Sequence, residues 1–138
     1  MGVIGRIARL NAAYGQAMHD NVARYGLNMA KFDVLATLRR SGEPYALSPG
    51  DLLKATMVAS GTMTNRIDRL VQDGLVARIP NPQDNRSVLI GLTEKGRALI
   101  DEVVGEHVTT QARLLQGLDE KDQEALTSLL IKAISVLD

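Results

Sequence analysis

The 138-residue sequence contains no cysteine. This absence excludes disulfide frameworks, cysteine-based zinc sites and thiol redox sensing, and it is compatible with a reducing compartment. No stretch reaches the roughly 18 continuous apolar residues of a membrane-spanning helix, and residues 1–10 lack the sustained apolar segment of an export signal. A chain of this length can bury a core without metals or cross-links. We therefore expect one domain over residues 1–138, a cytoplasmic location and no membrane partner.

Residue patterns that carry enzyme chemistry are also missing. The two histidines, His19 and His107, lie 88 positions apart, so a zinc site would need carboxylates from elsewhere in the chain. Ser48 and Ser60 have no neighbouring His or Asp arrangement that would activate a hydroxyl. The sequence has no glycine-rich phosphate loop and no paired-carboxylate motif. We expect a protein that is not an enzyme and that holds neither a cofactor nor a metal.

The formal net charge is zero, but the charges are unevenly distributed. Residues 1–97 hold 13 Lys and Arg against 8 Asp and Glu, a net charge of +5. Residues 98–138 hold 3 against 8, a net charge of −5. A zero total therefore does not argue against nucleic-acid binding, because the positive charge gathers in one part of the chain.

Residues 60–74 have the pattern of an amphipathic helix. Its apolar side carries Met63, Ile67, Leu70 and Val71, and its polar side carries Thr62, Asn65, Arg66 and Arg69. Ser60 is placed to cap the first free amides, and Gly74 is placed to end the helix in the left-handed conformation. Arg pairs with guanine, Asn with adenine, and Thr offers a hydroxyl or a methyl group, so the polar side suits the reading of a major groove. An ordinary helix with a solvated outer face has the same spacing.

A β-hairpin is predicted directly after this helix. Residues 75–79 and 87–92 are rich in Val, Ile and Leu, and they flank the turn-forming run at residues 80–85. A helix followed by a twisted hairpin is the outline of a winged helix. Arg86 lies near the hairpin tip, where a basic side chain can enter a minor groove or contact phosphate. The alternative is that Asp84, Asn85 and Arg86 form only a polar turn.

The remaining chain is predicted to be helical. Apolar stripes at three- and four-residue spacing mark residues 3–25, 27–40 and 93–116, and a last helix that Asp119 caps. Ser48 and Pro49 start a further helix, and 56–59 is the turn before the polar helix. The terminal helices carry more apolar surface than a small winged-helix core can cover. We therefore expect a mostly α (α+β) winged helix-turn-helix over residues 27–92, with residues 1–26 and 93–138 forming a helical dimerisation layer.

Several motifs resemble the multiple antibiotic resistance regulator (MarR) family of bacterial winged-helix repressors. They lie at residues 27–35, 61–70, 73–76, 84–86 and 92–97, in the same order and spacing. The family's wing most often reads Asp-Arg-Arg, whereas Asn85 stands at the middle position here. The resemblance implies a homodimer that binds double-stranded DNA at a pseudo-palindromic operator, usually as a repressor. The DNA contacts we expect are Ser60, Thr62, Thr64, Asn65, Arg66, Arg69, Asp84 and Arg86.

Related repressors often accept aromatic or phenolic effectors between the dimer layer and the winged helix. Side chains that could line such a pocket are Tyr14, Met18, Met29, Phe32 and Tyr45. The alternative, which we favour, is that these residues are core. Two other functions are open: a winged-helix module that uses the same face on a protein partner, and a small helical protein that buffers a metal or ligand. Glu or apolar residues at the outward positions would favour the protein partner, and they are not found there.

Overall fold

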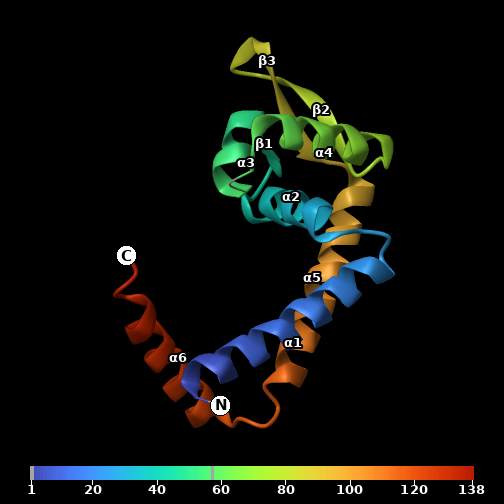
Figure 1. Cartoon of the computed structure of the whole chain (residues 1–138). Coiled ribbons are helices and arrows are strands. Elements are labelled where there is room, and N and C mark those ends of the chain that lie inside the picture. The colour runs from blue at the N-terminus through green and yellow to red at the C-terminus, as the bar shows by residue number, and fades with distance from the viewer. Residues whose placement is uncertain (1, 57) are drawn as a thin grey trace.

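The computed structural model describes residues 2–56 and 58–138, and within them the chain forms a winged-helix head and a set of long helical arms (Figure 1). The elements in chain order are α1 (Val3–Arg24), α2 (Met29–Arg40), β1 (Ala46–Leu47), α3 (Pro49–Thr56), α4 (Ser60–Gln72), β2 (Val76–Asn81), β3 (Asp84–Leu92), α5 (Glu94–Leu114) and α6 (Glu120–Ile134). The mostly helical winged-helix fold expected from the sequence is therefore confirmed.

The head consists of α2, α3, α4 and a small antiparallel sheet in the order β1-β3-β2. Its core is built from apolar side chains that are fully buried, among them Leu35, Leu38, Leu52, Leu70 and Ile90. Burying each such side chain contributes about 1.5–3 kcal/mol of transfer free energy. The sheet and α2 thus hold α4 by its apolar side and leave its polar side outward.

The strands differ from the prediction in two respects. The strand β1 was not predicted, because its two residues, which pair with Gly91 and Ile90, are too few to show an alternating pattern. The turn predicted over residues 80–85 is wrong in extent, since β2 runs through Asn81 and β3 begins at Asp84. Pro80 lies within β2, and β2 is an edge strand, where the missing proline N–H costs no ladder hydrogen bond.

The start of α3 and the end of α4 agree with the sequence. The helix α2 begins at Met29 and α5 ends at Leu114, each two residues inside its predicted bound, and the start of α4 also differs. Gly74 has φ of +75°, and the Ser48 hydroxyl accepts a hydrogen bond from the Asp51 N–H at 3.1 Å, both as predicted. Ser60 does not cap α4. It is already the first helical residue, Ala59 occupies the cap position without a side-chain hydrogen bond, and the Ser60 carbonyl instead accepts from the Thr64 hydroxyl at 3.0 Å.

The start of α5 is fastened to the end of α4. The Thr93 hydroxyl donates to the Gly74 carbonyl at 2.7 Å, and the Lys95 ammonium donates to the Asp73 carbonyl at 2.9 Å. Gly96 packs so closely under this turn that a Cβ atom at its position would overlap the Leu75 carbonyl. The helix that reaches into the arms therefore begins in direct contact with the helix that carries the polar face.

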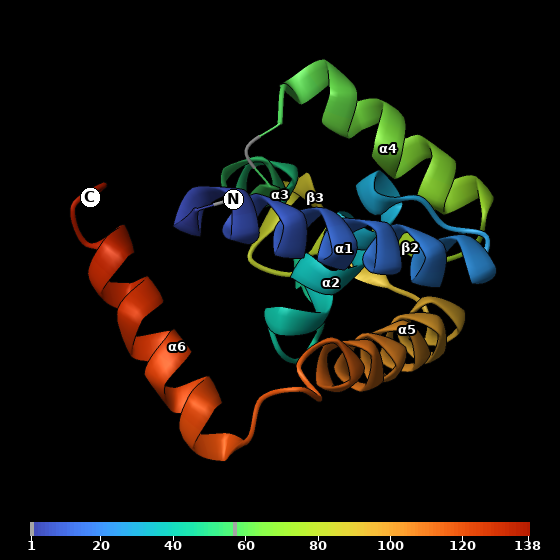
Figure 2. The same cartoon turned by 60° about the horizontal axis from the view of Figure 1, so that its bottom comes forward.

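The arms are α1, the far part of α5, and α6. The helices α1 and α5 lie side by side, whereas α6 lies apart from the other elements of its own chain (Figure 2). None of the α6 side chains is buried, and Leu129, Ile131 and Ile134 are 64%, 63% and 51% exposed. The apolar surplus expected for the terminal helices is present in this single chain.

Candidate nucleic-acid interface

The outer face of α4 is polar along its length. Thr62, Asn65 and Arg69 are exposed and follow one another at three- and four-residue spacing, so they stack along one side of the helix. Met63, Ile67 and Leu70 lie under them, at most 4% exposed, and fix the helix to the core. This face therefore presents a hydroxyl, an amide and a guanidinium on a rigid support.

The other residues predicted on α4 lie at its start and along its flanks. Ser60 is exposed in the first turn, and the Thr64 hydroxyl already donates to the Ser60 carbonyl. Arg66 is only half-exposed, because it lies further round the helix from Asn65 than Arg69 does. Asn65 is thus at the centre of the polar face, with Ser60, Thr64 and Arg66 at its borders.

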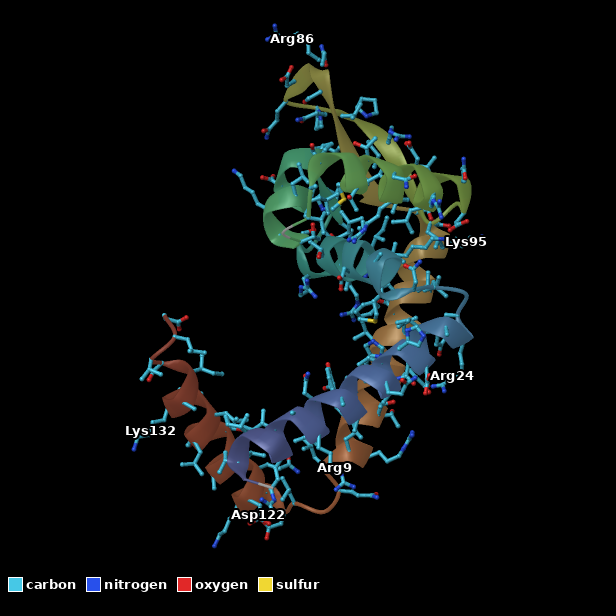
Figure 3. All side chains as sticks on the ribbon, viewed as in Figure 1. Arg9, Arg24, Arg86, Lys95, Asp122 and Lys132 are labelled. Atoms are coloured by element: carbon cyan, nitrogen blue, oxygen red, sulfur yellow. The ribbon has the colours of Figure 1, made fainter. Side chains whose placement is uncertain are left out.

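The hairpin of β2 and β3 is the wing, and Arg86 lies at its tip, as labelled in Figure 3. Its side chain is 95% exposed. The Asp84 carboxylate accepts a hydrogen bond from the Arg86 N–H at 3.0 Å and lies 3.7 Å from the Arg86 Nε. Asp84 therefore shapes the turn that holds Arg86 out, a local side-chain-to-backbone contact typical of Asp in turns.

Further residues surround this face that the sequence did not single out as contacts. A polar hollow of about 540 Å³ runs beside α4, lined by Lys31, Asn65, Asp68, Arg69, Gln72 and Asp73. Helical spacing could have identified two of these residues, because Asp68 and Gln72 follow Asn65 by three and seven residues. Lys31 comes from α2, so only the tertiary structure brings it here.

Ion pairs hold α4 on both sides of its polar face. The Lys31 ammonium lies 2.7 Å from the Asp73 carboxylate and ties the end of α4 to α2. The Arg78 guanidinium donates to the Asp68 carboxylate and ties the middle of α4 to β2. Asp68 and Asp73 are five residues apart, which places them about 140° apart around the helix.

A buried polar cluster joins α1 to α5 below the head. The Asn21 amide donates to the Thr110 hydroxyl at 2.8 Å and lies 3.3 Å from His107 Nδ1. Burial lowers the pKa of His107, and the neighbouring carboxylate of Glu106 opposes this shift. Among the described residues, His107 Nε2 is buried and has no hydrogen-bond partner.

The five residues predicted for an effector pocket lie at separate places. Met18 is buried one turn before Asn21, and the Phe32 ring lies 4.8 Å from the ring of His107, so these two share the junction of α1, α2 and α5. Met29 is 37% exposed in the first turn of α2. Tyr45 packs under the Arg97 guanidinium, 4.1 Å from the ring centre. Tyr14 lies on the arms, where its hydroxyl accepts from Gln111 at 3.4 Å.

Tyr14 borders an apolar groove of about 590 Å³ between α1, α5 and α6. The lining of this groove is almost entirely apolar and includes Ile7, Leu10, Leu114, Leu115, Leu126 and Leu130. Exposed apolar patches of this kind mark surfaces that another molecule covers.

The winged-helix part of the chain matches a known family. The MarR family model covers residues 27–88. The HTH-type transcriptional regulator PecS of Dickeya dadantii is 42% identical over 130 residues, which cover 94% of this chain and 78% of that protein. The chain belongs to the MarR family. The resemblance drawn from the motifs is confirmed, and the protein is a transcriptional regulator of a family that is not enzymatic.

Two solved structures are similar to this chain over nearly its whole length. A mutant MarR from E. coli complexed with operator DNA has a TM-score of 0.74 and 29% identity, and the match covers 95% of this chain and 93% of that one. BpsR of Bordetella bronchiseptica, whose DNA binding is regulated by 6-hydroxynicotinic acid, has a TM-score of 0.72 and 31% identity over 96% and 92%. No helix among residues 2–56 and 58–138 is long and apolar enough to span a membrane.

Proposed function

We propose that this MarR-family protein is a cytoplasmic repressor that binds a pseudo-palindromic operator in double-stranded DNA as a homodimer. The observation that carries the proposal is the position of Asn65 at the centre of an exposed, rigidly supported polar face, with the almost fully exposed Arg86 on the adjacent wing. The helix has the width and side chains for a major groove, and a wing beside it reaches the neighbouring backbone or minor groove.

The arms support the homodimer. The groove between α1, α5 and α6 is apolar, and α6 has no buried side chain within its own chain. A second copy related by a two-fold axis would bury both surfaces at once and would present two copies of α4 to the DNA. This arrangement would explain why a regulator of 138 residues keeps three helices outside its head.

The operator and the role of Asn65 are tested together. Selection from a random duplex pool with purified protein is expected to return a motif with two-fold symmetry. On that duplex, Asn65→Ala is expected to cost about 1–3 kcal/mol and to relax the preference at one position in each half-site, because a bidentate amide-to-adenine contact is lost. Recovery of no preferred duplex would favour the alternative, a module that uses this face on protein.

The wing is tested by salt dependence. Arg86→Ala is expected to weaken binding to operator and scrambled duplex alike, and to reduce the slope of log K against log salt by about 0.9 per subunit if the lost contact is with phosphate. Arg9→Ala is the matched control, since it removes the same charge from α1 at the far end of the molecule (Figure 3). If Arg86→Ala gave the same DNA-binding curves as the parent protein at three salt concentrations, the wing would have no part in DNA binding.

We further propose that a small aromatic or phenolic effector releases the protein from DNA. BpsR offers a precedent through its regulation by 6-hydroxynicotinic acid. The support in this chain is the junction of α1, α2 and α5, where Phe32 and His107 face each other between head and arms. Titration of the operator complex with a panel of phenols and aromatic acids should identify a compound that dissociates it, and Phe32→Ala should blunt that response. No release by any of the panel would contradict the proposal.

A further inference from the structure

Asp68 is an unexpected residue for a surface that approaches a polyanion. It is exposed on α4 three residues after Asn65, on the edge of the polar face opposite Asp73. A carboxylate at this place repels phosphate. Its partner is Arg78, whose guanidinium donates to it from β2.

The path of Arg78 explains how the two residues meet. Successive side chains of a strand point to opposite faces, so Arg78 shares a face of β2 with Val76, which is 2% exposed in the core. Arg78 also pairs with Ile90 across the ladder, and Ile90 is buried as well. Arg78 therefore continues the core-facing side of the wing just beyond the core, where the next surface it meets is α4.

This ion pair links α4 to the wing at the level of Ile90, where the buried core ends along β3. The chain connects α4 to β2 through the turn at residues 73–75, and Arg78 is the third residue of β2. Beyond Arg78 the two strands lead to the tip, and Ile79 and Val88 on this outer part are 39% and 43% exposed. The ion pair is therefore well placed to set the angle at which the wing leaves α4.

We propose that Asp68 and Arg78 form a brace that fixes the wing against α4 and so places Arg86 on DNA. Asp68 is in this view a positioning residue, which acts through Arg78 and the wing without touching DNA. The inference rests on the proposed function, because it assumes that α4 and the wing bind one duplex together.

The brace and the loss of a negative charge predict opposite changes in DNA affinity for the substitution Asp68→Asn. Asp68→Asn removes a negative charge from the DNA-facing side, so electrostatics alone predicts tighter binding and a steeper salt dependence. The brace predicts weaker binding, because the wing is no longer held where Arg86 meets the duplex. We expect about a fivefold loss of affinity for the selected operator, within the range that positional couplings of contacting residues show.

The matched control is Asp101→Asn. It makes the same change of charge and breaks an exposed ion pair of the same kind, in which Arg39 Nε lies 2.7 Å from the Asp101 carboxylate, but on α5 and α2 away from the wing. This variant is expected to bind operator within about twofold of the parent, since exposed pairs are worth little by themselves. Thermal unfolding of both variants checks that each is folded.

A double-mutant cycle with Arg86→Ala separates positioning from any other effect of Asp68. If Asp68 acts through the wing, Arg86→Ala costs about tenfold in the parent but less than about threefold in the Asp68→Asn background. Arg78→Gln removes the other partner of the ion pair and should reduce the cost of Arg86→Ala in the same way. It replaces Asp68→Asn in the experiment if Asp68→Asn does not fold.

Tighter or unchanged binding by Asp68→Asn would overturn the brace, and so would an equal cost of Arg86→Ala in both backgrounds. Failure of the proposed function looks different, because Asn65→Ala and Arg86→Ala would then both bind like the parent. A large effect of Arg86→Ala with none of Asp68→Asn leaves DNA reading by helix and wing in place and removes only the brace.

Discussion

The head and the arms of this protein bury their apolar residues in different ways. In the head, Leu35, Leu38 and Leu70 are completely buried within one chain. In the arms, Val3 and Ile4 of α1 and Leu129 and Ile131 of α6 are between 63% and 78% exposed. The head therefore has a complete hydrophobic core within one chain. The apolar side chains of the arms would, on our proposal, be buried against a second copy of the chain.

The two regions share one rigid element. The helix α5 begins at the Thr93 and Gly96 contacts with the end of α4 and continues beside α1 to the groove at Leu114. The Asn21 and His107 cluster lies midway along it. On our proposal, a change in the spacing of the arms reaches α4 through α5, and an effector would act by shifting the separation of the two copies of α4 in the dimer.

The largest expected effect comes from a charge in the arms. Leu130→Asp places a carboxylate in the apolar groove, and in a two-fold dimer the cost of several kcal/mol for burying it counts twice. We expect sedimentation at micromolar concentration to show a monomer with a folded head. Ser128→Asp is the control, with the same charge on an exposed polar position of α6. A Leu130→Asp protein that remained a stable dimer would contradict the assignment of this groove.

The second largest effect is expected for a substitution at the contact between the head and the start of α5. Gly96→Ala forces a Cβ atom into the Leu75 carbonyl, which is backbone and cannot rotate away, and we expect a loss of about 3 kcal/mol in unfolding free energy. Gly105→Ala on the same helix meets no atom within 4 Å and should stabilise by up to about 1 kcal/mol, because alanine favours the helix. Denaturant unfolding of the two variants should therefore show shifts of opposite sign.

Most of the fold could be predicted because its signals are local. The period of Met63, Ile67 and Leu70 located α4, and Gly74 and Asp119 marked helix boundaries through their own chemistry. The strand β1 could not be predicted, since two residues carry no period and it exists only by pairing with β3. The Ser60 cap was wrong because any Ser before an apolar run looks like a cap, and the sequence did not reveal that the helix begins one residue earlier.

The site could be predicted only as far as local signals extend, over one helix face and the hairpin tip. Thr62, Asn65 and Arg69 are neighbours by helical spacing alone, and the structure places them so. The partners of Asp68 and Asp73 come from β2 and α2, and nothing in the local sequence pairs them. The same limit applies to the buried cluster at Asn21, because its partners His107 and Thr110 lie 86 and 89 positions away in the sequence.

A smaller effect is expected at the junction between head and arms. Asn21→Ala leaves His107 and the Thr110 hydroxyl without their shared partner in a buried place, which should cost about 1–3 kcal/mol in stability. Gln16→Ala on the same helix removes an exposed contact with Asp20 and should change stability by less than about 0.5 kcal/mol. Equal melting temperatures for the two variants would mean that the cluster does not hold α1 to α5.

The smallest effect is a dependence of stability on pH. Burial lowers the pKa of His107 in the folded chain from its ordinary value of 6.5, and the charged groups beside it are Glu106 and the Arg24 that pairs with Glu106. The unfolded chain therefore binds the proton more readily. The contribution of His107 to the free energy of unfolding therefore has its full value above pH 6.5. It decreases as the pH falls from 6.5 through the lowered pKa of His107 in the folded chain.

His107→Gln should remove this contribution while keeping a polar side chain beside Asn21. Because Gln does not titrate, the variant's unfolding free energy should fall less than the parent's as the pH decreases below 6.5, and the two curves should run parallel above it. His19→Gln is the control, since His19 is exposed on α1, and it should keep the parental curve. Denaturant unfolding at a series of pH values measures all three. A parental pH dependence in His107→Gln would show that the proton is bound elsewhere, and the junction would then hold head and arms together in the same way at every pH.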